Sequence, residues 1–147
     1  GLFRVMSDAV TIAVTRDIVT CQRLRRVVFI EEQGVSEADE VDGLDGSAIH
    51  LLAFHGTEPV GTARLLVKGE VGKIGRVCVL PVARGTGLGA ALIRAALDVL
   101  RDQPGLTSAY LGSQSHATGF YEKLGFVVEG EEFLDAGIPH RHMRRAL

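Results

Sequence analysis

The sequence is poor in the residues that cross-link or interrupt small folds. Its 147 residues include no tryptophan, two cysteines and four prolines. The cysteines, Cys21 and Cys78, both lie in segments with apolar periodicity, so we expect buried thiols in a reducing compartment such as the cytoplasm rather than a disulfide. The prolines stand singly and no stretch has low complexity, which favours one folded domain over domains joined by a linker.

Long apolar runs and an excess of one charge are also absent. No apolar stretch approaches the roughly 18 residues that a membrane span requires, and no signal-peptide pattern is present. The formal net charge is −2, which argues against nucleic acid as the main partner. We therefore expect a single cytoplasmic domain over residues 10–147, with neither a membrane nor a nucleic-acid partner. Residues 1–9 are expected to be a disordered or vector-derived start.

Hydrophobic periodicity divides the rest of the chain into strands and helices. The predicted strands are Val10–Val14, Ser47–Phe54, Pro59–Val67, Lys73–Leu80, Leu106–Leu111, Phe126–Leu134 and Ile138–Leu147. Helices are predicted from a cap at Thr15 or Asp17 to about Ile30, from Gly87 to Pro104-Gly105, and over Ala117–Leu124. The strands on either side of the second helix should be parallel, because they form a βαβ crossover, and the others antiparallel. The pattern predicts an α/β sheet that is antiparallel at both ends.

An acidic segment separates the first helix from the next strand. Glu31–Asp45 holds seven carboxylates and neither lysine nor arginine. It can be a solvated loop, as most charge runs are, or a lip of the active site that attracts a cationic amine. Its length, which is long for a plain connector, keeps both interpretations open.

A glycine-rich loop, Arg84–Gly89 (RGTGLG), follows the apolar strand that ends at Pro81 and precedes the long helix. A strand, a glycine loop and a helix in this order direct free backbone N–H groups and the positive end of a helix dipole at an anion, usually a phosphate. A dinucleotide-binding loop would need G-x-G-x-x-G and an acidic residue after the next strand, and a P-loop would need a lysine after the last glycine. Neither pattern is present.

The loop does match the R-x-x-G-x-G/A signature of the GNAT family of N-acetyltransferases, which it resembles. A second block, Ala117–Phe126 (ATGFYEKLGF), is similar to that family's A-x-x-F-Y-x-x-x-G-F segment, and one helix and one strand separate the two blocks. Phe29–Gln33 and the ending Gly137–His140 resemble the small ElaA-type bacterial branch. The resemblance implies a mixed, mostly antiparallel sheet whose central parallel strand pair splays apart at the cofactor site, with helices on its faces.

The resemblance also implies a function: transfer of an acetyl group from acetyl-CoA (coenzyme A as carrier) to a primary amine by direct attack, with a small molecule as the expected acceptor. The alternative on the same fold is a non-catalytic acyl-CoA sensor or interaction module. The resemblance implies that the coenzyme contacts three parts of the chain. These are the glycine loop, with Arg84, Gly85, Thr86, Gly87, Leu88 and Gly89; the strand that corresponds to the family's fourth strand, with Val77, Cys78 and Val79; and the side chain of Gln114. No metal is expected, and a homodimer is left open.

Tyr121, the tyrosine of the F-Y pair, would protonate the leaving CoA thiolate. The base that deprotonates the amine is open, because Arg76 stands on the strand where many relatives carry Glu or His. We favour His116 and Glu40, and the other candidates are Glu32, Asp42, His50 and His140. Cys78 is not expected to act as a nucleophile, because nothing near it in the sequence would lower its pKa.

Overall fold

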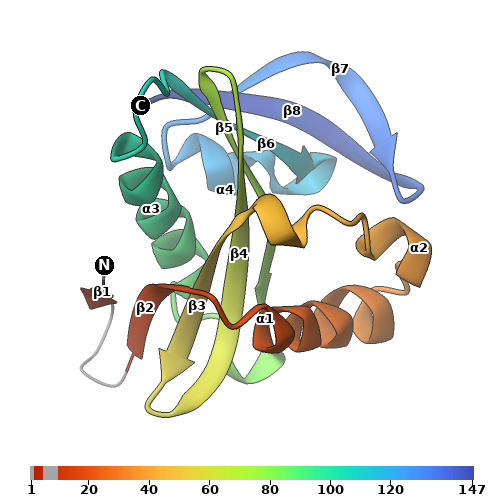
Figure 1. Cartoon of the computed structure of the whole chain (residues 1–147). Coiled ribbons are helices and arrows are strands. Elements are labelled where there is room, and N and C mark those ends of the chain that lie inside the picture. Colours follow the sequence, from red (N-terminus) through yellow and green to blue (C-terminus); the bar gives the residue numbers. More distant parts are fainter. Residues whose placement is uncertain (1, 5–9) are drawn as a thin grey trace.

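The computed structural model describes residues 2–4 and 10–147, which form an eight-stranded sheet in the order β1-β2-β3-β4-β5-β6-β8-β7 (Figure 1). The strands are β1 (Leu2–Arg4), β2 (Val10–Thr15), β3 (Ile49–His55), β4 (Glu58–Lys68), β5 (Val71–Val79), β6 (Ser108–Gln114), β7 (Val127–Asp135) and β8 (Ile138–Ala146). The helices are α1 (Ile18–Arg25), α2 (Glu37–Glu40), α3 (Leu88–Arg101) and α4 (Thr118–Glu122). Among the strands of the described residues, only β5 and β6 pair in parallel, and the predicted fold class is confirmed.

Two helices cover opposite faces of the central strands (Figure 1). Successive side chains of a strand point to opposite faces. On β3, Leu51 belongs to the core cluster that contains α3, whereas Leu52 packs with Cys21 and Leu24 of α1. The sheet is therefore the middle layer between α1 and α3. None of the described helices is long and apolar enough to cross a membrane.

The long helix α3 packs unusually close to the sheet at two glycines. A Cβ built on Gly72 of β5 would lie 2.5 Å from Leu100 Cδ2, and one on Gly61 of β4 would lie 3.2 Å from Leu92 Cδ1. Leu92 and Leu100 are completely buried. The glycines thus let the helix lie directly against the strands that carry the candidate site.

The first helix begins at Asp17, whose Oδ1 accepts a hydrogen bond from Thr20 N at 3.1 Å, while Thr15 Oγ1 accepts one from Asp17 N. A side-chain acceptor at this position satisfies an amide that has no partner inside the helix. After Arg25 the helix widens into a π-helical segment, Arg26–Glu32. The predicted cap at Asp17 and end near Ile30 agree with this within two residues.

Two segments differ from a plain expectation of irregular chain. Within the start that was expected to be disordered or vector-derived, Leu2–Arg4 pair antiparallel with Thr11–Ala13 of β2; the edge of β2 offers main-chain groups that any extended segment can pair with. Residues 1 and 5–9 lie outside the described part of the chain. The acidic segment is not a plain loop, since it contains α2 and a 3₁₀ turn at Asp45–Ser47.

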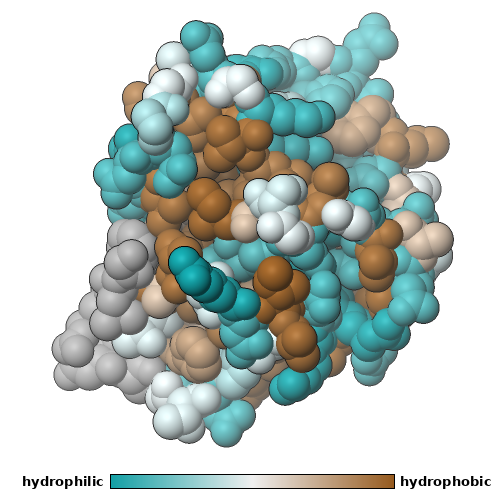
Figure 2. Space-filling view, in the orientation of Figure 1, coloured by the Kyte–Doolittle hydropathy of each residue, from teal (hydrophilic) through white to brown (hydrophobic). Residues whose placement is uncertain are grey.

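Figure 2 shows the surface of the same view, with apolar side chains in the central part bordered above and on the right by mostly hydrophilic ones. The right-hand border lies where Figure 1 places α2 and the β7–β8 hairpin. These two elements are also walls of the site described next.

Candidate functional site

The parallel strands β5 and β6 pair only at their beginnings. The paired positions are Val71 with Ser108, Gly72 with Ala109, and Lys73 with Tyr110. Beyond Lys73, β5 stays paired with β4 and β6 stays paired with β8, but the two strands part from each other. Along this gap the two facing edges no longer bond to each other, and their N–H and C=O groups can bind an extended, amide-bearing ligand as if it were another strand.

A β-bulge marks the point where β5 turns away. Thr62 pairs with Cys78 and Arg64 pairs with Gly75, so Arg76 and Val77 together oppose a single residue of β4. Arg76 has a φ of 48°, which is uncommon for a residue other than glycine. A bulge bends its strand and redirects the backbone groups beside it, and here it widens the gap between β5 and β6.

The glycine loop is held by a hydrogen bond within itself, and it leads directly into the first turn of α3. Gly85 and Gly87 have φ values of 75° and 84°, a region that favours glycine, and Gly87 directly precedes the helix. Thr86 Oγ1 donates to the Ala83 carbonyl at 2.6 Å. The earliest helical bond of α3 runs from Ala91 N to the Gly87 carbonyl at 3.1 Å. The amides before Ala91 lack helical acceptors, as at every helix start, and form an anion site together with the dipole.

A cavity of about 310 Å³ lies between the separated strands. β5 contributes Lys73–Val77 to its wall, and β6 contributes Tyr110–Gly112 and Gln114. Tyr121 of α4 also lines it. The remaining walls are the segment from Phe29 to Glu40 on one side and the turn between β7 and β8 on the other.

The Tyr121 side chain is held in the cavity wall by two aromatic neighbours. Its ring lies edge-on to Phe120, with centroids 4.9 Å apart, and edge-on to Phe126 at 6.3 Å. Burial raises the pKa of the Tyr121 phenol. A phenol with a raised pKa keeps its proton at neutral pH, so Tyr121 can act as a hydrogen-bond or proton donor to a group in the cavity.

The thiol of Cys78 is chemically inert by comparison. Its side chain is 4% exposed and packs in the small cluster under α1. Burial raises the pKa of Cys78 to about 12. The thiolate that a nucleophile needs is therefore absent at neutral pH, in agreement with the sequence interpretation. Cys21 is also free.

A family model described as an acetyltransferase (GNAT) domain matches residues 25–147, which is most of the chain. The chain belongs to the GNAT acetyltransferase family. This confirms the resemblance that the two sequence blocks indicated.

Relatives of this GNAT chain include Protein ElaA of Escherichia coli, which is 35% identical over 84% of this chain and 83% of that protein. The crystal structure of ElaA aligns with a TM-score of 0.78, covering 87% of this chain and 88% of the other. An acyl-CoA N-acyltransferase from Pseudomonas aeruginosa, 34% identical, aligns with a TM-score of 0.83 over 99% and 100% of the two chains. A GNAT family acetyltransferase from Elizabethkingia anophelis with acetyl-CoA bound shares the fold, with a TM-score of 0.73 at 18% identity over 96% and 100%.

Arg84, a predicted coenzyme contact of this GNAT domain, uses its side chain within the protein. Its Nε donates to the Val79 carbonyl at 3.0 Å, and its two terminal nitrogens pair with the Glu32 carboxylate. The guanidinium thus links the glycine loop to the end of the π-helical segment. The backbone of the loop is left for an anion, and Glu32 is occupied rather than free to act as a base.

The predicted residues Gln114 and His116 contact each other. His116 Nε2 lies 2.8 Å from Gln114 Oε1, so this nitrogen donates to the amide oxygen. Gln114 lines the cavity, but His116 is exposed and is not among the lining residues. The structure therefore brings Gln114 to Tyr121 and leaves His116 outside.

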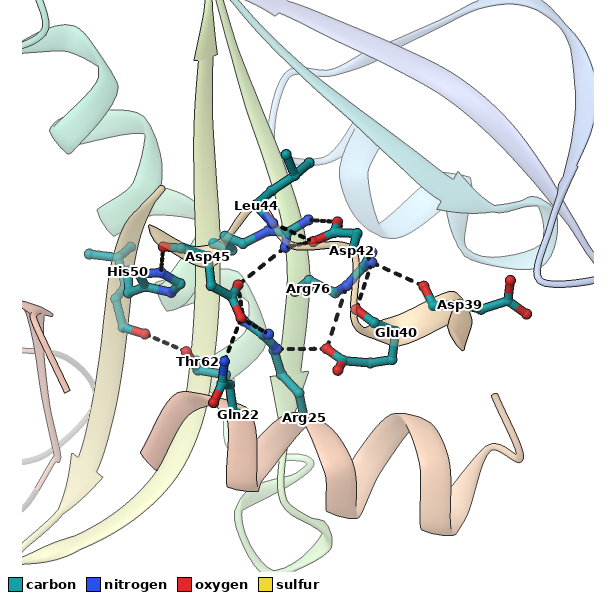
Figure 3. Close-up of polar contacts among 12 residues, drawn as sticks. Gln22, Arg25, Asp39, Glu40, Asp42, Leu44, Asp45, His50, Thr62 and Arg76 are labelled. Atoms are coloured by element: carbon teal, nitrogen blue, oxygen red, sulfur yellow. Dashed lines mark hydrogen bonds and ion pairs between the residues drawn. The ribbon is translucent and has the colours of Figure 1, made fainter. Parts of the chain in front are cut away.

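Glu40, the other favoured base, is anchored by arginines (Figure 3). It is 4% exposed, and its Oε1 accepts a hydrogen bond from Arg25 Nε at 2.7 Å and lies 3.6 Å from Arg76 Nε. Arg25, 1% exposed, also donates to both oxygens of Asp45. A carboxylate committed to two guanidinium groups has a structural task, although Glu40 does reach the cavity wall.

The network continues through Arg64, which is 4% exposed and donates to both oxygens of Asp42 at 2.8 and 2.7 Å. Hydrogen bonds from Arg64 lower the pKa of Asp42 to about 2. Arg76 adds a contact of 3.3 Å to Asp42 and one of 3.1 Å to the Glu40 carbonyl. Three carboxylates of the acidic segment are therefore neutralised against the sheet, and the interpretation of the segment as a free, amine-attracting lip is wrong for them.

Sequence reasoning missed an aromatic and histidine cluster on one wall. The Phe133 ring stacks on His142 with centroids 4.1 Å apart, and the Tyr110 hydroxyl bonds to His142 Nδ1. Tyr110 and Phe133 line the cavity. The period-two placement of His140 and His142 in the last strand was a visible signal, but its partners depend on strand register, which the sequence does not reveal.

Proposed function

We propose that this GNAT chain transfers an acetyl group from acetyl-CoA to the primary amine of a small molecule by direct attack. The observation that carries the proposal is the gap between β5 and β6, with the glycine loop beyond the end of β5 and Tyr121 in the wall of the gap. A splayed strand pair accommodates an extended ligand, the loop accommodates its phosphates, and the tyrosine donates a proton. The free thiols of Cys21 and Cys78 support a reducing compartment, and we propose the cytoplasm.

The residues present fit the coenzyme. Main-chain amides of Gly85–Gly89 would hold the diphosphate, helped by the dipole of the 14-residue α3. The edge of β5 at Val77–Val79 faces the gap and would pair with the amides of the pantetheine arm, beside the Val79 carbonyl that already accepts from Arg84. Gln114 would reach the same arm from β6. The neighbour crystallised with acetyl-CoA supports this arrangement through its fold.

When bound, the thioester supplies an acetyl carbon that is open to attack by an amine. The nitrogen lone pair forms the C–N bond, and the pair of the C–S bond leaves with sulfur. Tyr121 donates its phenolic proton to that sulfur; the phenol is protonated at neutral pH, and burial raises its pKa further. A backbone amide near the Arg76 bulge would bind the carbonyl oxygen as its negative charge develops.

The cavity supports a small acceptor. Its volume of about 310 Å³ is at the low end of small-molecule sites. The wall carries both signs of charge, with Lys73 and Arg76 on one strand and Asp39 and Asp135 at the rim. A compact, polar amine would find partners for its charged groups here.

A CoA-release assay over a panel of small amines tests the function, with Tyr121→Phe as the diagnostic variant. We expect at least one amine to exceed the buffer rate, and Tyr121→Phe to lower kcat about 10²-fold or more because the proton donor is lost. Acetyl-CoA affinity should stay within about twofold, since the ring remains. Binding of acetyl-CoA without turnover of any amine would contradict the proposal and favour an acyl-CoA sensor.

A further inference from the structure

We propose that His140 is the catalytic base that takes the proton of the acceptor amine, an inference that rests on the proposed function. An alkylammonium group must lose a proton before its nitrogen can attack, because the charged form has no lone pair. On β5, Arg76 lines the cavity, and its guanidinium donates to the Asp39 and Glu40 carbonyls of α2 and to Asp42 beside it. The base must therefore come from another wall of the cavity.

His140 occupies the wall formed by the last strands. In the sheet it lies opposite Gln114 of β6 and opposite Phe133 of β7. Residues directly opposite each other share a face of the sheet, and all three line the cavity. The other face of these strands carries Leu111 and Met143, which are buried in the core with α3. The imidazole is thus on the cavity side.

The protonation pattern of the ring is fixed by the backbone. His140 Nδ1 lies 2.7 Å from the Ile138 carbonyl oxygen. A carbonyl can only accept, so Nδ1 carries the hydrogen, and the lone pair of the neutral ring is on Nε2. Within the described residues the structure records no protein partner for Nε2. The tilted ring of Phe133, with centroids 5.7 Å away, holds the imidazole in place.

The turn that presents this histidine is strained. Ala136 and Gly137 connect β7 to β8 with φ values of 51° and 76°, a type I′ geometry that favours Asn-Gly. Among the described residues other than glycine, only Ala136 and Arg76 have positive φ, and both line this one cavity. Strain of this kind tends to collect at functional sites. It supports the cavity as the place where the acceptor reacts.

The other imidazoles are worse placed. His116 donates to Gln114 outside the cavity, and His142 is stacked on Phe133 and bonded to Tyr110. His50 is 2% exposed and bonded to the Asp45 carbonyl, on the far side of the ion-pair network. Among the described histidines, His140 alone lines the cavity.

The charged groups that share the cavity with His140 come from every wall. They are Lys73 and Arg76 on β5, Asp39 and Glu40 on α2, and Asp135 on β7, with the phenols of Tyr110 and Tyr121. Glu40 is held by arginines, and Asp39 accepts a hydrogen bond from Ser36 Oγ at 2.9 Å. Carboxylates as a class are weaker bases than imidazole. Neutral imidazole accepts a proton without carrying a charge beforehand, and His140 presents such a ring to the cavity.

The protons balance as follows. The ammonium group gives one proton to His140 Nε2, and its nitrogen then forms the C–N bond as the C–S pair leaves with sulfur. Sulfur takes the Tyr121 proton, and the new amide nitrogen loses a second proton that restores the phenol through solvent. His140 releases its proton to solvent. The sum converts an ammonium and a thioester into an amide, a thiol and one free proton.

The test compares log(kcat/KM) against pH for the wild type, His140→Gln and His55→Gln with two amines of different basicity. His55 is exposed at the end of β3, far along the chain from the β7–β8 hairpin, and serves as the matched control. We expect His140→Gln to lower kcat/KM at neutral pH about 10²- to 10⁴-fold. It should also remove the rising limb that both amines share, while acetyl-CoA affinity stays unchanged. His55→Gln should match the wild type.

The melting temperature of each variant serves as the control for correct folding. A second control is His140→Ala, whose rate should recover when imidazole is added. A residue with a purely structural role would not show this recovery. An unaltered pH profile in His140→Gln, or loss of the limb in His116→Gln instead, overturns the inference but leaves acetyl transfer standing. If the wild type turns over no amine at all, the proposed function fails and this inference fails with it.

Discussion

At the residue scale, the charges that hold the acidic segment also make the fold sensitive to acid. The pKa of Asp42 falls from 3.8 to about 2 in the folded protein because Arg64 bonds to its carboxylate. The unfolded chain therefore binds more protons between about pH 4 and about pH 2, so the stabilisation from Asp42 is complete above pH 4 and disappears as the pH falls through 2.

We expect Asp42→Asn to lower the free energy of unfolding at pH 7 by about 1–2 kcal/mol, since a hydrogen-bonded charge pair with a buried arginine is weakened. The difference from the wild type should shrink toward zero as the pH falls from about 4 to about 2. Urea titrations at several pH values measure this. Asp98→Asn, which removes an exposed pair with Arg101, is the control and should change stability by less than about 0.5 kcal/mol. A constant difference at all pH values would refute the assignment.

The same network shows what the sequence can and cannot tell at this scale. The clustering of carboxylates in Glu31–Asp45 is visible in one dimension, but the arginines that neutralise them come from α1, β4 and β5. Without the register of those strands, the sequence cannot distinguish an acidic segment that is neutralised by arginines from one that is free to attract an amine. Tyr121 was predicted from a local block of sequence, and Gln114 lies just before that block. The place of His140 in the cavity wall, in contrast, follows only from its pairing with β6 and β7.

At the element scale, the crossover helix depends on glycine beneath it. Gly72 is in the short stretch where β5 and β6 still pair, and a Cβ there would lie 2.5 and 2.8 Å from the two methyl carbons of Leu100. We expect Gly72→Ala to destabilise the protein by about 1–3 kcal/mol, as overpacking of a tight core does, and to lower the melting temperature.

Calorimetry on Gly72→Ala and Gly46→Ala measures the effect. Gly46 has open space around its Cα and no positive φ, so its substitution by alanine should leave the melting temperature nearly unchanged. Equal melting temperatures for the two variants would show that Leu100 can move aside without cost, and that α3 does not need the close approach.

The elements themselves were largely predictable, because each has a strong local signal. Seven of the strands and the three longer helical patterns appear where the periodicity places them, with boundaries shifted by a few residues. The parallel pairing of β5 and β6 followed from the crossover rule. The early end of that pairing and the bulge at Arg76 did not follow, since both come from the packing of neighbouring strands and from no local pattern.

At the scale of the whole molecule, coenzyme binding should stabilise the fold, because the proposed site joins β5, the glycine loop and α3. A ligand at 100 times its Kd adds about 2.7 kcal/mol, which corresponds to a rise of roughly 5–10 °C for a chain of this size. We expect acetyl-CoA and CoA to produce this shift in a thermal melt, and NAD and ATP at equal concentration to produce much less, since neither carries a pantetheine arm.

A comparison of two glycines that both have positive φ tests where the diphosphate binds. Gly87→Val places a side chain at φ 84° in the phosphate loop, and Gly56→Val does so at φ 62° in the β3–β4 turn, away from the gap. Both variants should melt somewhat below the wild type, because a β-branched residue is strained at positive φ. Only Gly87→Val should lose the rise caused by CoA. If Gly56→Val loses it as well, strain and not the anion site explains the result; if Gly87→Val keeps it, the diphosphate binds elsewhere.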